Sequence, residues 1–228
     1  MDQVEIRIKS TGEGIEDALD MTDYSGKRAG LERKELLRLR LLAEELIGLI
    51  RGIAGDVEAD YCIGHEGKQF RISLDSDIKL TREMRKGIIS LSSKGENAKA
   101  VGVMGRIREM VAVALLPGDK DSSMMSGVSL GTMSMGGASG MGTDMTTAQI
   151  YSWSMQEYKK VLESKAGYNK EAEKRWDEVE KSIVANIADD IVVSVDGSHV
   201  EIVIYKEFEW SWLNDMKHNS ERYIPKPE

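Results

Sequence analysis

Two segments of this chain alternate apolar and polar residues on either side of a short turn, and they restrict the possible folds more than any other feature. In the first, the alternation runs through residues 61–63 and 70–74. In the second, it runs through residues 191–195 and 200–204, on either side of the dipeptide Asp196-Gly197. A period of two gives a strand one buried face. Each segment therefore predicts an antiparallel hairpin with one apolar face, and the Asp-Gly turn strengthens the second prediction.

The remaining elements are one further strand and several helices. Val4, Ile6 and Ile8 alternate with charged residues and predict a strand near the start of the chain. From Glu32 to about Ile53 apolar residues recur at three- and four-residue steps without a proline, which indicates a long amphipathic helix. Other helices are expected at 15–21, 80–91, 101–116, 149–163 and 169–188. The fold class is therefore α/β: a two-layer sandwich in which a mixed, mainly antiparallel sheet of about five strands is covered on one face by helices.

One segment interrupts this pattern of strands and helices. Residues 118–147 contain seven glycines, six methionines and six serines but no aromatic residue, a composition that cannot offset the entropy of ordering. We interpret it as a flexible loop, and we favour a plain insertion over partner contact and partner contact over Cu(I) binding by its methionines. Residues 1–117 then form the first part of one domain, 148–208 supply its closing helices and hairpin, and 209–228 form a tail whose two tryptophans could anchor a partner.

Charge and composition exclude several classes of protein. The 228 residues include 31 Lys and Arg against 39 Asp and Glu, a formal charge of −8, which opposes attraction to nucleic acid or to anionic membranes. No run of 18 apolar residues occurs, and the first residues lack the basic and apolar regions of a secretory signal. The single cysteine, Cys62, allows no internal disulfide. We therefore expect a cytoplasmic protein that binds neither nucleic acid nor membrane.

Standard catalytic motifs are missing from the sequence. Gly67-Lys68 lacks the glycine spacing and the following Ser or Thr of a phosphate-binding loop. There is no Gly-x-Ser-x-Gly elbow. Cys62 and His65 are three residues apart on a predicted strand, so their side chains should point to opposite faces. We expect neither a serine nor a cysteine triad.

A family resemblance lies in the long helix. The residues Leu39-Arg40-Leu41-Leu42-Ala43-Glu44-Glu45-Leu46-Ile47-Gly48-Leu49-Ile50-Arg51 resemble the first conserved helix of the histidine-kinase-type ATPases, the Bergerat or GHKL fold. The closest branch is that of the anti-sigma factors and serine-protein-kinase-like proteins. In that family an acid on this helix activates a water molecule, and an asparagine four residues later holds magnesium against ATP. Glu44 matches the acid. Magnesium would lack a ligand here, because Gly48 replaces the asparagine and has no side chain.

Further segments resemble the same family in the same order along the chain. After the first hairpin the family has an aspartate that reads the adenine amino group, and Asp77 is available in the corresponding stretch. Two later segments resemble the loop and helix start that surround the phosphates. The resemblance thus implies that ATP or ADP binds to six candidate residues: Glu44, Asp77, Lys94, Asn97, Gly102 and Gly105.

Two functions remain open at this stage. The first is a cytoplasmic regulatory protein with weak or altered adenine-nucleotide binding, as the resemblance implies. The alternative is a catalytically inactive module that binds a protein partner or a second copy of itself. For Glu44 and Glu45, the alternative to a binding role is that one of them lies at the solvent edge of the helix and pairs with Arg40 or Arg51. An active kinase or ATPase is not expected, since no complete set of phosphoryl-transfer residues is present.

Overall fold

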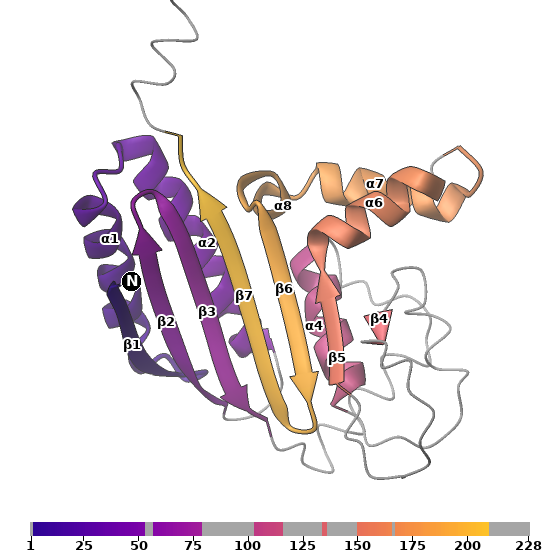
Figure 1. Ribbon diagram of the computed structural model, residues 1–228. Coiled ribbons are helices and arrows are strands. Elements are labelled where there is room, and N and C mark those ends of the chain that lie inside the picture. The colour runs from indigo at the N-terminus through magenta and orange to yellow at the C-terminus, as the bar shows by residue number, and fades with distance from the viewer. Residues whose placement is uncertain are drawn as a thin grey trace, which may run out of the picture.

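The computed structural model describes residues 2–52, 57–78, 103–115, 134–135, 150–165 and 167–209. These residues form a seven-stranded sheet with helices packed against one of its faces (Figure 1). The strands are β1 (Asp2–Lys9), β2 (Glu58–Glu66), β3 (Gln69–Asp77), β4 (Ser134–Met135), β5 (Ile150–Ser154), β6 (Asp190–Asp196) and β7 (His199–Glu207). The described helices are α1 (Ile15–Arg28), α2 (Arg33–Gly52), α4 (Val103–Ala114), α6 (Met155–Lys165), α7 (Lys170–Glu180) and α8 (Ile183–Ile187).

The strand order in the sheet is β1-β2-β3-β7-β6-β5-β4. Every described pair is antiparallel, and the predicted α/β class with a one-sided helix layer is confirmed. The two hairpins lie side by side because β3 pairs with β7, which places Leu74 opposite Ile202 although the two strands are far apart in the sequence. This pairing forms the centre of the sheet.

Both predicted hairpins are confirmed, and each has a two-residue turn. In the first, Glu66 is opposite Gln69, so Gly67 lies in the turn with a φ of 57°. In the second, Asp196 is opposite His199, and Gly197 has a φ of 60°. Both glycines occupy the left-handed region that the tight turns of hairpins require. The turns hold the strands in the register that keeps the apolar side chains on one face.

The first helix is longer than the sequence predicted. We expected it to end before residues 25–30, but α1 continues to Arg28 and includes Gly26. A Cβ atom at Gly26 would lie 2.6 Å from Leu36 Cδ2 and 3.1 Å from Leu39 Cδ2. The glycine therefore marks a close approach of α1 to α2 and not the end of a helix.

The segment from 149 to 188 corrects two other predictions. Residues 150–154, expected to begin a helix, form β5, in which Trp153 is buried and lies opposite Val193 of β6. Pairing with the free edge of β6 outweighs the helical pattern, and residues such as isoleucine, tyrosine and tryptophan suit a strand. The helix expected at 169–188 is divided into α7 and α8, and the Ser182 hydroxyl accepts a hydrogen bond from the Ala185 amide at the start of α8.

Several predictions lie outside the described residues. They include the helix at 80–91 and, apart from Glu209, the tail at 209–228. Of the loop predicted at 118–147, Ser134 and Met135 are described, and they form β4 beside β5. No strand was predicted there. Together with β5, this strand accounts for the difference between the expected five strands and the seven observed.

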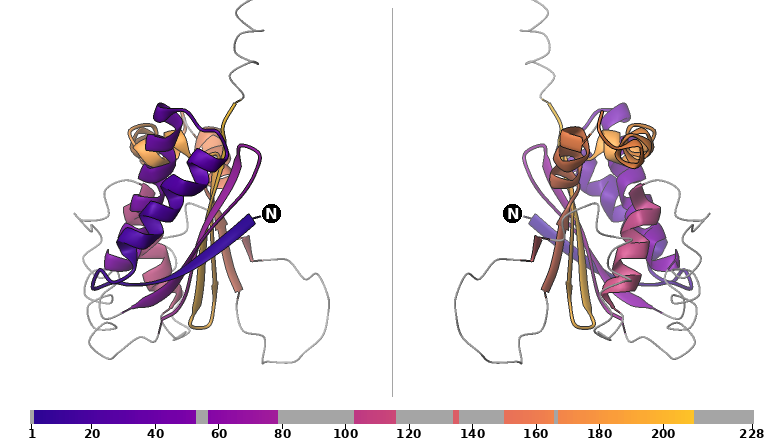
Figure 2. Two further views of the ribbon diagram at one scale, coloured as in Figure 1. Left: turned by 90° about the vertical axis from the view of Figure 1, so that its left-hand side faces the viewer. Right: turned by 90° about the vertical axis from the view of Figure 1, so that its right-hand side faces the viewer.

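The hydrophobic core lies between the sheet and the helices. Helix α2 contacts β3 and β7, while α1 contacts β1 and β2 and α4 contacts β6. Figure 2 shows these three helices on the same side of the sheet. The apolar stripe of α2 is fully buried, as predicted, at Leu39, Leu42, Leu46 and Leu49. Helices α6 and α7 pack against each other and extend beyond the end of the sheet (Figure 1).

Candidate functional site

The face of the sheet opposite the helices, which we call the open face, has no described helix packed on it (Figure 2). Its residues alternate along each strand with the buried residues of the core. Most of its charged side chains are acidic. Among the described residues, the acidic ones are Glu5, Glu58, Asp60, Glu66, Asp75, Asp77, Asp190, Asp196, Glu201 and Glu207, and the basic ones are Arg7, Lys9 and Arg71.

The helix layer has a different charge balance. Helices α1 and α2 together carry seven acidic and seven basic residues: Glu16, Asp17, Asp20, Asp23, Glu35, Glu44 and Glu45 against Lys27, Arg28, Arg33, Lys34, Arg38, Arg40 and Arg51. These two helices are therefore neutral in sum. In the described part of the chain, the excess negative charge is concentrated on the open face.

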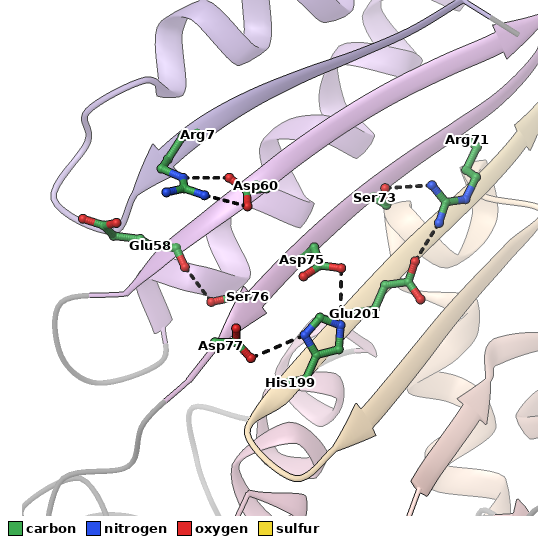
Figure 3. A network of polar contacts seen from close by, with 10 residues as sticks. All are labelled: Arg7, Glu58, Asp60, Arg71, Ser73, Asp75, Ser76, Asp77, His199 and Glu201. Atoms are coloured by element: carbon green, nitrogen blue, oxygen red, sulfur yellow. Dashed lines mark hydrogen bonds and ion pairs between the residues drawn. The ribbon is translucent and has the colours of Figure 1, made fainter.

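Where β3 ends and β7 begins on the open face, His199 lies between two carboxylates (Figure 3). Its Nε2 atom is 3.4 Å from Asp75 Oδ2, and its Nδ1 atom is 3.5 Å from Asp77 Oδ1. The register of β3 against β7 creates this arrangement, since it places Asp77 opposite His199 and Asp75 opposite Glu201. All three ionisable side chains are partly open to solvent: His199 is 48% exposed, Asp75 45% and Asp77 71%.

Two neighbouring carboxylates are already paired with arginines. Asp60 of β2 accepts two hydrogen bonds from Arg7 of β1, at 2.8 and 3.0 Å, and these hold the pKa of Asp60 below its ordinary value. Glu201 accepts a 2.7 Å hydrogen bond from Arg71, as Figure 3 shows. Within the described residues, no arginine or lysine forms such a pair with Asp75 or Asp77, whose partner is His199.

Asp75 is in an unfavourable setting for a charged carboxylate. Burial raises its pKa, and the nearby charges of Glu201, Asp60 and Asp77 raise it further, while His199 opposes them. A positive charge placed beside Asp75 would remove part of this cost. This end of the open face therefore favours a cationic group.

The structure places Glu44, the first predicted nucleotide-binding residue, on the exposed side of α2. Its Oε1 atom accepts a 3.0 Å hydrogen bond from Arg40 Nε, and Arg40 also donates to Asp23 of α1 at 2.6 Å. The alternative expected from the sequence, a pair between Glu44 and Arg40 at the solvent edge, is confirmed. A Cβ atom at Gly48, one turn later, would meet no atom within 4 Å.

The other predicted residues do not gather around Glu44. Asp77 belongs to the open face, on the far side of the sheet from the helices. Gly105 is buried in the first turn of α4. Lys94, Asn97 and Gly102 lie outside the described residues. Adenine-nucleotide binding by this set stays a prediction.

Sequence reasoning did not single out Asp75, His199 and Glu201 as a group. A partial signal was present, because the polar positions of the predicted strands are mostly acidic and could be recognised as one face. The missing information was that β3 lies beside β7. The hairpins show which strands pair locally, but no local pattern shows how two hairpins are arranged in a sheet.

Two further observations concern the site. In the part of the chain that the structure describes, no three His, Cys, Asp or Glu side chains are arranged to hold a metal ion. None of the described helices combines the length and the apolar character needed to cross a bilayer.

Comparison of the chain with models of protein families, with curated proteins and with solved structures finds no match.

Proposed function

We propose that this chain is a protein–protein interaction module that binds the basic surface of a partner protein through the open face of its sheet. The observation that carries the proposal is the charge imbalance of that face, which combines ten acidic with three basic side chains among the described residues. We further propose a cytoplasmic location, in keeping with the single cysteine.

Charge decides between the possible occupants of the open face. Complementary charge steers two proteins together and suppresses wrong partners. A second copy of this chain would present the same acidic face in a two-fold dimer, so like charges would oppose self-association there. Nucleic acid and anionic lipid would be repelled for the same reason. A basic protein segment is the occupant that the face fits.

The proposal predicts that a lysine-rich peptide binds the protein and that the carboxylates of β3 carry much of the affinity. The variant Asp75→Asn/Asp77→Asn is expected to raise the dissociation constant about tenfold, because it removes two neighbouring carboxylates that no arginine pairs. Isothermal titration calorimetry at two salt concentrations measures this change, and binding should weaken at the higher salt concentration.

A matched control has the same change in net charge on the helix layer. Asp17 and Asp20 are exposed on α1, so Asp17→Asn/Asp20→Asn should change the dissociation constant less than about twofold. An equal loss of affinity in both double variants would show that the peptide responds only to overall charge. That result would overturn the open face as the docking surface.

Adenine-nucleotide binding is the second candidate function. One observation favours it: α4 begins at Val103, two residues before Gly105. The resemblance implies that a helix starting in this segment surrounds the phosphates. The amides at the start of a helix can bind anions. Against it, the Glu44 carboxylate is bound to Arg40. The open-face proposal does not need a nucleotide site.

Titration with ATP and with ADP, each with and without magnesium, separates the two candidates. If the chain is an interaction module alone, we expect no heat of binding and no rise in Tm for the parent protein, and Glu44→Ala should behave in the same way. If ATP raises the Tm of the parent and Glu44→Ala reduces that rise, the nucleotide candidate is supported. Circular dichroism of Glu44→Ala confirms that the variant is folded.

A further inference from the structure

His199 lies at one end of the β3–β7 pair, on the open face. It is the first residue of β7, and both of its ring nitrogens lie within 3.5 Å of a carboxylate oxygen. A neutral imidazole has one N–H donor and one acceptor nitrogen, so it can satisfy one of the two carboxylates and presents a lone pair to the other. The protonated ring presents a donor to each. The geometry therefore suits the charged form of His199.

We propose that protonation of His199 regulates docking: the charged ring occupies Asp75 and Asp77, the two carboxylates that a basic side chain of the partner would otherwise contact. Binding of the partner is then strong when the ring is neutral and weaker when it is protonated. This inference rests on the proposed function, because it concerns the same face and the same basic partner.

The charged groups around His199 come from the strands on both sides of it. On β6, Asp196 lies directly opposite His199 in the register of the sheet. The others are drawn in Figure 3. Strand β3 supplies Asp75 and Asp77, and β7 itself supplies Glu201, which Arg71 pairs. Strand β2 supplies Asp60, which Arg7 pairs. Since the arginines are already paired, His199 is the described group that can add or remove a positive charge beside Asp75 and Asp77. Histidine is the side chain that ordinarily gains or loses its charge between about pH 5 and 8.

The direction of the effect follows from competition. A protonated His199 offsets one of the two negative charges of Asp75 and Asp77, so a lysine of the partner meets a weaker attraction there, and the imidazolium also repels the lysine. The contacts are partly exposed, which limits the effect to about fivefold in the dissociation constant. By linkage, a partner that favours the neutral ring must release a proton from the protein when it binds near the midpoint of the titration.

The test compares the parent protein with His199→Gln and His65→Gln, using a lysine-rich peptide without histidine at constant ionic strength. For the parent, we expect the peptide to bind about fivefold more weakly at pH 5.5 than at pH 7.5. His199→Gln should lose most of this dependence and bind like the parent at pH 7.5, because the neutral ring and the amide carry the same charge. His65 stacks on Phe70, whose ring is buried in the core, so His65→Gln should keep the dependence of the parent.

Calorimetry in two buffers of different ionisation enthalpy provides a second measurement. Binding of the peptide at about pH 6.5 should release protons from the parent and far fewer from His199→Gln. If the parent and His199→Gln show the same pH dependence and the same proton release, the switch is refuted while docking on the open face stands. If the peptide binds none of the three proteins at either pH, the proposed function is refuted together with the switch.

Discussion

Replacement of Leu46 by alanine is expected to lower the free energy of unfolding by about 3 kcal/mol. Leu46 lies near the middle of α2 and is fully buried in the core between the helices and the sheet. The substitution removes apolar surface from the core and leaves a cavity that the surrounding side chains fill only in part. Urea denaturation followed by circular dichroism measures the loss as a lower midpoint at a similar slope.

Leu37 provides a matched control on the same helix, because its side chain is 60% exposed. Leu37→Ala makes the same change in side-chain volume and helix propensity, so its cost should stay within about 0.5 kcal/mol. The difference between the two variants measures the burial of α2 against the sheet. Similar losses from both substitutions would contradict the packing of α2 described above.

Replacement of Lys68 by methionine is expected to be nearly as damaging, with a loss of about 3 kcal/mol. Lys68 lies in the β2–β3 turn and is 5% exposed. Its ammonium group contacts both carboxylate oxygens of Glu35 at 3.1 Å and the carbonyl oxygen of Glu209 at 3.1 Å. Methionine keeps the apolar part of the side chain. It leaves the Glu35 carboxylate, which is 18% exposed, without the positive charge of Lys68.

Lys181→Met is the control for the loss of a lysine in an ion pair. Lys181 and Asp177 form an ion pair of the same 3.1 Å length in which the side chains are 78% and 62% exposed, and its removal should cost less than about 1 kcal/mol. In addition, the double variant Lys68→Met/Glu35→Gln should recover part of the loss, because the unpaired charge is gone. A loss for Lys68→Met no larger than that for Lys181→Met would show that the pair contributes little to stability.

Lys68 also bears on the candidate site. Through its contacts it joins the β2–β3 turn to the start of α2 and to the chain after β7, where the Phe208 amide donates to the Lys68 carbonyl. These contacts lie at one end of the β3–β7 pair. The acidic group around Asp75 and His199 lies at the other end of the same pair. The stability of this pairing is therefore a condition for the proposed function.

Local sequence patterns were sufficient for both hairpins and for α2, because the periods of two and of 3.6 residues report which side chains face the core. They were misleading where a local signal had two meanings. The polar, glycine-containing stretch 25–30 predicts the end of a helix, but Gly26 within it allows the close contact of α1 with Leu36. Residues 150–154 carried a helical pattern, but the free edge of β6 makes them a strand.

The predicted and observed sites differ for a related reason. Glu44 was selected from the order of residues along one helix, and its position on α2 is as expected. Its carboxylate, however, is held by Arg40, whose second bond goes to Asp23 of another helix. The group of Asp75, Asp77 and His199 is drawn from two strands of different hairpins. No spacing along the chain could have indicated it.

The chain thus encodes its layers locally, since alternation alone separates the side chains of the core from those of the open face and also makes the open face acidic. The position of His199 beside Asp75 and Asp77 has a different origin. It arises when the two hairpins pair through β3 and β7, and that choice depends on how the whole helix layer buries the apolar face of the sheet. The pairing of distant strands depends on the free energy of the complete core, which includes contacts between residues far apart in the sequence. The pattern of a short segment does not contain this information.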